Sequence, residues 1–279
     1  MWQMLSFDFM QYAILAGILA SIACGIVGSL VVVNRMVFLA GGVAHAAYGG
    51  VGLAFFFGLP VLPCTVGFSL GASMLMAGIS LRYKEKADTA IGVLWAAGMA
   101  FGIILLDLTP GYNVDLMSFL FGSILAVPVQ DLWLMAALDV LVIAATCYLY
   151  PGLLLLSFDR EFARVRGLSV TFLHCLMVGM AALTVVMIIR VVGLILVIAL
   201  LTIPPFMAQR NARSLAGMMI RAIGWSIMFC LGGLAISYQF DITSGASIIA
   251  VAAVCFFIAM LVDAARRAFL NRRTGEKTV

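Results

Sequence analysis

Charged residues are scarce in this sequence. Asp, Glu, Lys and Arg make up 10% of its 279 residues, whereas 65% are hydrophobic and the mean hydropathy is +1.20. Soluble domains carry about 25% charged residues, so the composition excludes an ordinary soluble domain and indicates an integral membrane protein. Continuous apolar runs of about 20 residues recur along the chain, which favours membrane-spanning helices over the alternating strands of a barrel.

Motifs for nucleotide binding and hydrolysis are also missing. The chain contains no GxxxxGK(S/T) phosphate loop, so it does not bind ATP by that route, and it contains neither HExxH nor GxSxG. Polar residues within apolar runs, such as Asp139, are better explained by hydrogen bonds in a helix bundle than by catalysis. We therefore predict that the chain is not an enzyme. A membrane-embedded enzyme is a less favoured alternative, because no paired catalytic motif is found.

The cysteines follow no recognisable pattern. There are six, without a CxxC pair, and most of them fall inside apolar runs, where a thiol behaves as a small hydrophobic group (Cys24, Cys64, Cys147, Cys175, Cys230 and Cys255). This distribution predicts neither a disulfide framework nor a zinc cluster. The first residues lack the basic region of a signal peptide, so we expect the first apolar run to stay attached as a helix.

Nine apolar segments are predicted as membrane spans, at residues 10–33, 37–58, 61–81, 88–108, 131–153, 171–189, 191–208, 222–238 and 246–264. The predicted fold class is therefore all-α, a polytopic membrane helix bundle of about eight or nine transmembrane helices. No Gly/Ser linker interrupts the chain. We predict a single transmembrane domain over residues 1–265, followed by a basic cytoplasmic tail at 266–279.

The basic residues predict the orientation. All but one of the 16 Lys and Arg residues fall on the same side of the predicted spans, and that side should be cytoplasmic. The N-terminus is then outside, the C-terminus is inside, and only Arg190 lies at the outer end. The opposite side carries acidic residues that would favour arriving cations, although simple solvation of loops explains most of them (Asp8, Asp107, Asp115, Asp131 and Asp241).

One apolar segment is too short to be a span. Residues 108–130 connect two predicted spans that both end outside, and their apolar core, residues 116–127, cannot cross the hydrocarbon. We predict that this core forms a re-entrant helix or a helix that lies on the surface.

Histidine occurs twice. His45 lies in the predicted span at 37–58, which also contains several glycines that would let neighbouring helices approach closely. A histidine there either bridges two helices by hydrogen bonds or offers an inward-facing ligand for a metal, and the residue alone favours neither interpretation. His174, near the cytoplasmic end of its span, is interpreted as a packed or interfacial side chain.

Two cytoplasmic segments have distinctive patterns. Residues 153–170 carry mixed charges at i,i+3 and i,i+4 spacing that predict a short helix ending at Gly167. Pro204 and Pro205 are expected to break the seventh span near the inner face. The basic segment that follows, with Arg210 and Arg213, resembles a docking element for a cytoplasmic partner, although an ordinary positive-inside loop explains it equally well.

The order of these segments resembles the permease subunits of ATP-binding-cassette importers for divalent metals, the zinc, manganese and iron uptake family. Stretches that carry the resemblance cover nearly the whole chain and include NRMVFLAGGVAHAAYGG, ADTAIGVLWAAG, LLLLSFDREFARVRGLSV and RVVGLILVIALLTIPPFMAQ. The last part also resembles the larger vitamin B12 and siderophore permeases. By that resemblance, the region from Pro205 to Arg221 contains the helix that contacts the ATPase, with Pro205, Gln209, Arg210 and Arg213 as the coupling residues.

The resemblance implies further partners. A separate cytoplasmic ATPase would hydrolyse ATP, an extracytoplasmic metal-binding protein would deliver the ion, and two copies of the permease would form a homodimer in a bacterial-type inner membrane. No nucleic acid is involved and no cofactor is permanently bound, because the divalent metal is the cargo. A stand-alone secondary metal transporter or channel is the alternative.

The expected metal site departs from the family pattern. Family members usually carry an Asp four residues before the histidine that matches His45, and this spacing places both ligands on one helix face. The Asp position is Gly41 here. Either another group completes the site, such as Asp139 or an outer Asp, or the ion passes with His45 and backbone oxygens alone. Because the hard oxygen ligand is missing, the sequence slightly favours zinc as the transported metal, since zinc binds imidazole well.

Overall fold

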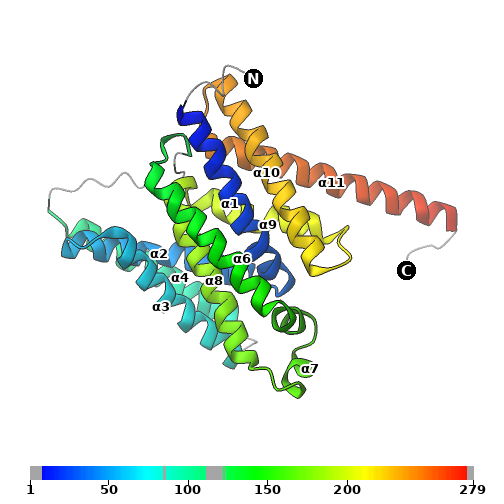
Figure 1. The fold of residues 1–279 in the computed structure, drawn as a ribbon, viewed down its shortest axis with the longest axis horizontal. Helices are drawn as coiled ribbons and strands as arrows, with labels where there is room; N and C mark the ends of the chain where they lie inside the picture. The colour runs from blue at the N-terminus through cyan, green and yellow to red at the C-terminus, as the bar shows by residue number, and fades with distance from the viewer. Residues whose placement is uncertain (1–7, 84–85, 111–121, 123, 275–279) are drawn as a thin grey trace.

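The computed structural model describes residues 8–83, 86–110, 122 and 124–274, with side chains up to residue 265. Its described residues form helices and turns (Figure 1). The elements are α1 (Asp8–Val33), α2 (Val37–Phe57), α3 (Val61–Arg82), α4 (Ala87–Asp107), the short 3-10 helix η3 (Ile124–Ala126), α6 (Val129–Phe158), α7 (Arg160–Val165), α8 (Val170–Val192), α9 (Leu194–Gln209), α10 (Leu215–Phe240) and α11 (Ser244–Thr274). The predicted all-α membrane bundle is confirmed.

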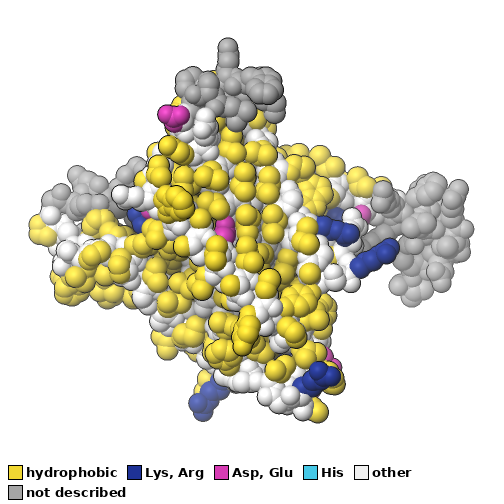
Figure 2. Space-filling view, viewed as in Figure 1, with side chains coloured by type: hydrophobic (Ala, Val, Ile, Leu, Met, Phe, Trp, Pro, Cys, Tyr) yellow, Lys and Arg dark blue, Asp and Glu magenta, His cyan; other side chains and the backbone are white. Residues whose placement is uncertain are grey.

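Two groups of helices share α8. Helix α1 packs against α6, α8, α9 and α10, whereas α2 packs against α3, α4 and α8. Figure 1 shows α2, α3 and α4 together on one side of the bundle and α11 leaving it on the other. The faces of α4, α6 and α11 expose large apolar side chains such as Ile104, Trp133 and Phe257, which suits contact with lipid. Figure 2 shows hydrophobic side chains over much of the visible face of the bundle.

The predicted spans and the observed helices differ mainly in length. Eight helices in the described part of the chain are long and apolar enough to cross a membrane, and α9 is a shorter apolar helix of 16 residues. Helix α10 begins seven residues before the predicted span at 222, and α11 continues through the boundary predicted at residue 265. Most of the predicted re-entrant segment, residues 116–127, lies outside the described residues, and η3 is its described end.

The predicted helix break at Pro204 and Pro205 is wrong. Helix α9 continues through both prolines to Gln209. Proline at position 205 cannot donate a hydrogen bond, so the carbonyl of Leu201 loses its helical partner. That carbonyl lies against Gly28 of α1, where an added Cβ would be only 2.6 Å from the oxygen. The close approach of α1 shields the freed carbonyl from lipid, and the helix persists because its neighbour covers the defect.

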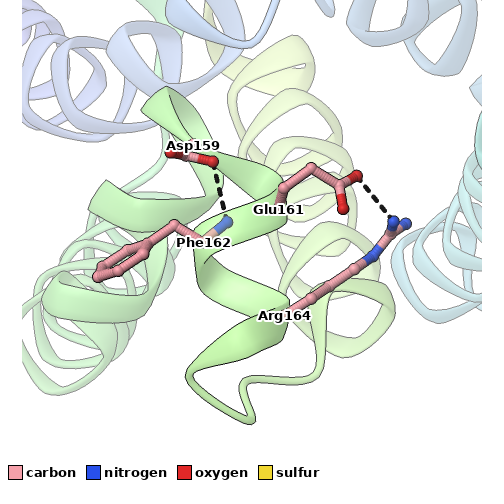
Figure 3. Close-up of polar contacts among 4 residues, drawn as sticks. All are labelled: Asp159, Glu161, Phe162 and Arg164. Carbon is pink, nitrogen blue, oxygen red and sulfur yellow. Dashed lines mark hydrogen bonds and ion pairs between the residues drawn. The ribbon is translucent and has the colours of Figure 1, made fainter.

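The predicted short helix after the fifth span is confirmed as α7 (Figure 3). Its N-cap is Asp159, whose side chain accepts a hydrogen bond of 2.9 Å from the backbone N–H of Phe162. Glu161 and Arg164 form the i,i+3 ion pair, also at 2.9 Å. Gly167 follows with φ +77°, a left-handed conformation that glycine adopts without a steric cost.

Helices α2 and α4 touch through their backbones. A Cβ added to Gly52 would lie 2.4 Å from the carbonyl oxygen of Gly102, and one added to Gly102 would lie 2.3 Å from the carbonyl oxygen of Tyr48. Small residues allow this approach, which maximises van der Waals contact where no hydrophobic force drives helices together. The arrangement fixes the position of α4 relative to the face of α2 that carries His45.

A single methyl group should disturb this contact. Gly102→Ala is expected to destabilise the protein by about 1–3 kcal/mol, because the clash is with backbone atoms that cannot rotate away. Gly71→Ala in α3 is the matched control, since nothing lies within 4 Å of its added Cβ. Thermal unfolding of the purified variants in detergent measures both effects. Equal midpoints for the two variants would contradict the close α2–α4 packing.

Candidate functional site

His45 lies about two turns into α2 and faces α4. Its ring stacks on the indole of Trp95, with ring centroids 4.2 Å apart and planes inclined by 20°. The Nδ1 atom is buried and has no hydrogen-bond partner among the described residues. Trp95 therefore fixes the plane of the ring, while one ring nitrogen stays available. The role of His45 as a metal ligand stays a prediction, since Nδ1 of the packed His174 is likewise buried without a partner among the described residues.

Gly41 lies one turn before His45, on the same face of α2. No atom lies within 4 Å of a Cβ added there, in contrast to Gly42, Gly49, Gly50 and Gly52 of the same helix. The space immediately around an added Cβ is therefore open, one turn before His45.

Among the described residues, no group of three or more His, Cys, Asp or Glu side chains is placed to hold a metal ion. Asp139 lies in α6, which packs against α1 and α8, and its carboxylate faces Ala23 and Cys24 of α1. Both carboxylate oxygens are buried. Asp139 thus belongs to a different part of the bundle from His45, because α6 packs against α1 and α8 whereas α2 packs against α3, α4 and α8.

The outer acidic residues do not converge on His45 either. Asp131, in the first turn of α6, lies 3.6 Å from Arg190 in the last turn of α8. The one cation predicted at the outer end is therefore used in an ion pair. Asp8, Asp107 and Asp241 lie at the ends of α1, α4 and α10, and Asp115 is outside the described residues.

His174 is packed in the bundle, as interpreted from the sequence. It is 3% exposed, and its Nε2 lies 2.9 Å from the hydroxyl oxygen of Ser80 on α3. The contact ties the N-terminal part of α8 to the end of α3.

The four predicted coupling residues lie at or near the junction of α9 and α10 but in different environments. Pro205 is buried against α1, whereas Gln209 and Arg213 are exposed. Gln209 lines a cavity of about 720 Å³ together with exposed aromatic rings that include Phe158 and Phe206. Arg210 turns back towards the bundle, where its guanidinium pairs with Asp263 of α11. Its contact with an ATPase stays a prediction.

Comparisons with known proteins agree with this architecture. A profile of the ABC 3 transport family matches residues 6–263. The chain belongs to that family. Among its relatives, a protein of Synechocystis sp. named "Uncharacterized membrane protein slr2045" is 50% identical over 260 residues, with 93% of this chain and 92% of the relative covered.

The chain is also similar to a relative with a functional name and to a solved structure. The manganese transport system membrane protein MntC of Listeria monocytogenes is 31% identical over 258 residues, covering 92% of each chain. The solved structure of PsaBC from Streptococcus pneumoniae in complex with Fab has a TM-score of 0.81 and 32% identity, with 90% of this chain and 91% of that chain covered.

Trp95 is the site residue that sequence reasoning missed. It lies 50 positions after His45, within the ADTAIGVLWAAG stretch, and an aromatic residue in an apolar span ordinarily indicates packing or lipid contact. Only the close α2–α4 approach, which depends on Gly52 and Gly102, brings its ring over the imidazole. The glycines were visible in the sequence, but their partners were not.

Proposed function

We propose that this chain is the membrane-spanning permease subunit of an ABC importer for a divalent transition metal. The observation that carries the proposal is the agreement of nearly the whole chain, in sequence and in fold, with family members such as MntC and PsaBC. His45 supplies the chemistry at the level of single residues. Its unpartnered imidazole nitrogen beside the open space at Gly41 is a group that zinc, iron and manganese all bind.

The metal preference follows from the missing carboxylate. Manganese prefers oxygen ligands, and the position that would supply one is Gly41. Zinc accepts imidazole readily. The MntC relatives are named for manganese, whereas the more similar Synechocystis protein carries no metal in its name. We infer that this chain tolerates zinc better than a member with the Asp–His pair does.

The transport cycle requires partners. A cytoplasmic ATPase docks at the α9–α10 junction, an external binding protein delivers the ion to the acidic outer ends, and two copies of the permease enclose the path. The N-terminus is outside, because the ends of helices that carry Arg35, Arg82, Arg164 and Arg213 then lie in the cytoplasm. ATP binding rocks the two bundles, and the ion pauses at His45 before its release inward. Incomplete coordination suits this step, because a fully ligated ion would be trapped.

Radiolabelled metal uptake in cells tests the proposal. Cells that express the chain with its ATPase and binding protein are expected to accumulate zinc, with excess unlabelled manganese as the competitor. Omitting the ATPase should abolish uptake. Uptake that persists without any ATPase would identify a stand-alone transporter or channel instead, and full competition by manganese would reverse the inferred metal preference.

A further inference from the structure

A second cavity lies where α9, α10 and α11 meet, apart from His45. It has a volume of about 800 Å³ and is lined by the last turn of α9, the α9–α10 junction, the N-terminal part of α10 and the middle of α11. Three of its lining residues are arginines and one is acidic (Arg210, Arg213, Arg221 and Asp263). Figure 2 shows dark blue side chains gathered beside α11, where that helix leaves the bundle, with a magenta side chain close to them.

The charges in this cavity are incompletely compensated. Arg210 pairs with Asp263 and also donates to the carbonyl of Ala259, at 3.3 Å. Arg221 donates to the carbonyl of Asn211, which is a neutral acceptor. Arg213 has no ion pair in the part of the chain that the structure describes. The cavity thus presents about two excess positive charges, which favours an anionic occupant.

The other walls are apolar and belong to membrane-spanning helices. Trp225 of α10 and Ile258 and Val262 of α11 line the same cavity, and the last two side chains are 55% and 45% exposed. Phosphate alone needs neither this volume nor this apolar lining. An anionic headgroup with acyl chains uses both, since the arginines bind the phosphodiester and the surface of α11 receives the chains. Tryptophan at the level of the headgroup is typical of the membrane interface.

From this geometry we propose that the cavity between α9, α10 and α11 binds an anionic phospholipid of the cytoplasmic leaflet. The lipid phosphate lies between Arg213 and Arg221, and its chains lie along Ile258 and Val262. Because the α9–α10 junction forms one wall, the bound lipid connects that junction to α11. The proposal rests on the charges and walls of the cavity and does not depend on which metal is transported.

Native mass spectrometry of the full chain in detergent tests the proposal. The protein is incubated with equal amounts of phosphatidylglycerol and phosphatidylcholine that have identical acyl chains. Phosphatidylglycerol is expected to be retained preferentially. Arg221→Gln should weaken its binding about five-fold, as expected for one basic residue near a lipid phosphate. Arg221 is chosen over Arg213 because Arg213 also belongs to the predicted contact with the ATPase.

Two further variants sharpen the test. Arg164→Gln removes an equal charge from the exposed helix α7 and should leave lipid binding unchanged, since Arg164 does not line the cavity. Asp263→Asn removes the one carboxylate of the cavity and should strengthen phosphatidylglycerol binding, opposite in sign to Arg221→Gln. These opposite shifts separate a charge effect from a loss of folding.

Three results would overturn the proposal. Equal retention of the two lipids would mean nonspecific annular binding. Equal weakening by Arg221→Gln and Arg164→Gln would mean that net charge alone is responsible. Displacement of the phospholipid by inorganic phosphate or glycerol 3-phosphate at the same concentration would mean that the cavity is a site for free anions.

Discussion

Replacing His45 by alanine should reduce the initial rate of metal uptake by at least about tenfold. His45 provides the imidazole beside the open space at Gly41 of α2. Even changes in the outer shell of a metal site cost 10–100-fold in affinity or activity. Uptake of radiolabelled zinc, normalised to the amount of protein in the membrane, measures the effect.

The matched variant is His45→Phe. Phenylalanine keeps an aromatic ring against Trp95, so it preserves the stacking contact, but it offers no nitrogen to a metal. If the role of His45 is ligation, both variants lose at least about tenfold of the uptake rate. If His45→Phe transports metal normally, the imidazole serves packing and the proposed site is refuted. His174→Asn controls for loss of a histidine elsewhere, since its amide can still bond to Ser80.

Introducing a carboxylate at Gly41 should change the metal preference. Gly41→Asp places an oxygen ligand four residues before His45, on the same face, and its Cβ meets no atom within 4 Å. Hard oxygen ligands favour manganese. We expect the ratio of manganese to zinc uptake to rise by about tenfold, as one added ligand interaction of about 1.4 kcal/mol would produce.

Gly41→Ala is the control for this substitution. Its methyl group enters the same open space without adding a ligand, so the ratio of manganese to zinc uptake should stay at the native value. Measurement of both ions in one dual-label uptake experiment removes differences in expression. A shift of equal size in both variants would show that helix packing, and not ligand chemistry, sets the preference.

The sequence predicted helices well and their partners poorly. Apolar runs of the right length identify spans because lipid offers the backbone no other choice, and α1, α2 and α4 agree with the predicted ranges to within a few residues. The predicted span at 222–238 covers only the later part of helix α10. Ser214 caps a helix that begins at Leu215 instead, by accepting a hydrogen bond from the N–H of Gly217 at 3.1 Å.

The sequence pattern could not predict contacts between distant segments. The stacking of Trp95 on His45 and the pairing of Arg210 with Asp263 each join residues at least 50 positions apart. Helix periodicity determines which residues share a face but not which helix the face meets. The prediction that two prolines break α9 failed for the same reason, because the residue that compensates for Pro205 is Gly28, which belongs to another helix.

The shortness of α9 has a consequence for how this protein is made. Its 16 residues extend about 24 Å, which is less than the roughly 30 Å of hydrocarbon that an independent span crosses. The turn at Gly193 connects it directly to α8, and most of its apolar residues are buried by protein. During biosynthesis, α9 is therefore poorly suited to leave the translocon as a separate unit. Helices α8 and α9 should enter the bilayer together as a hairpin. Helix α1 is then already in place to pack against the part of α9 that contains the two prolines.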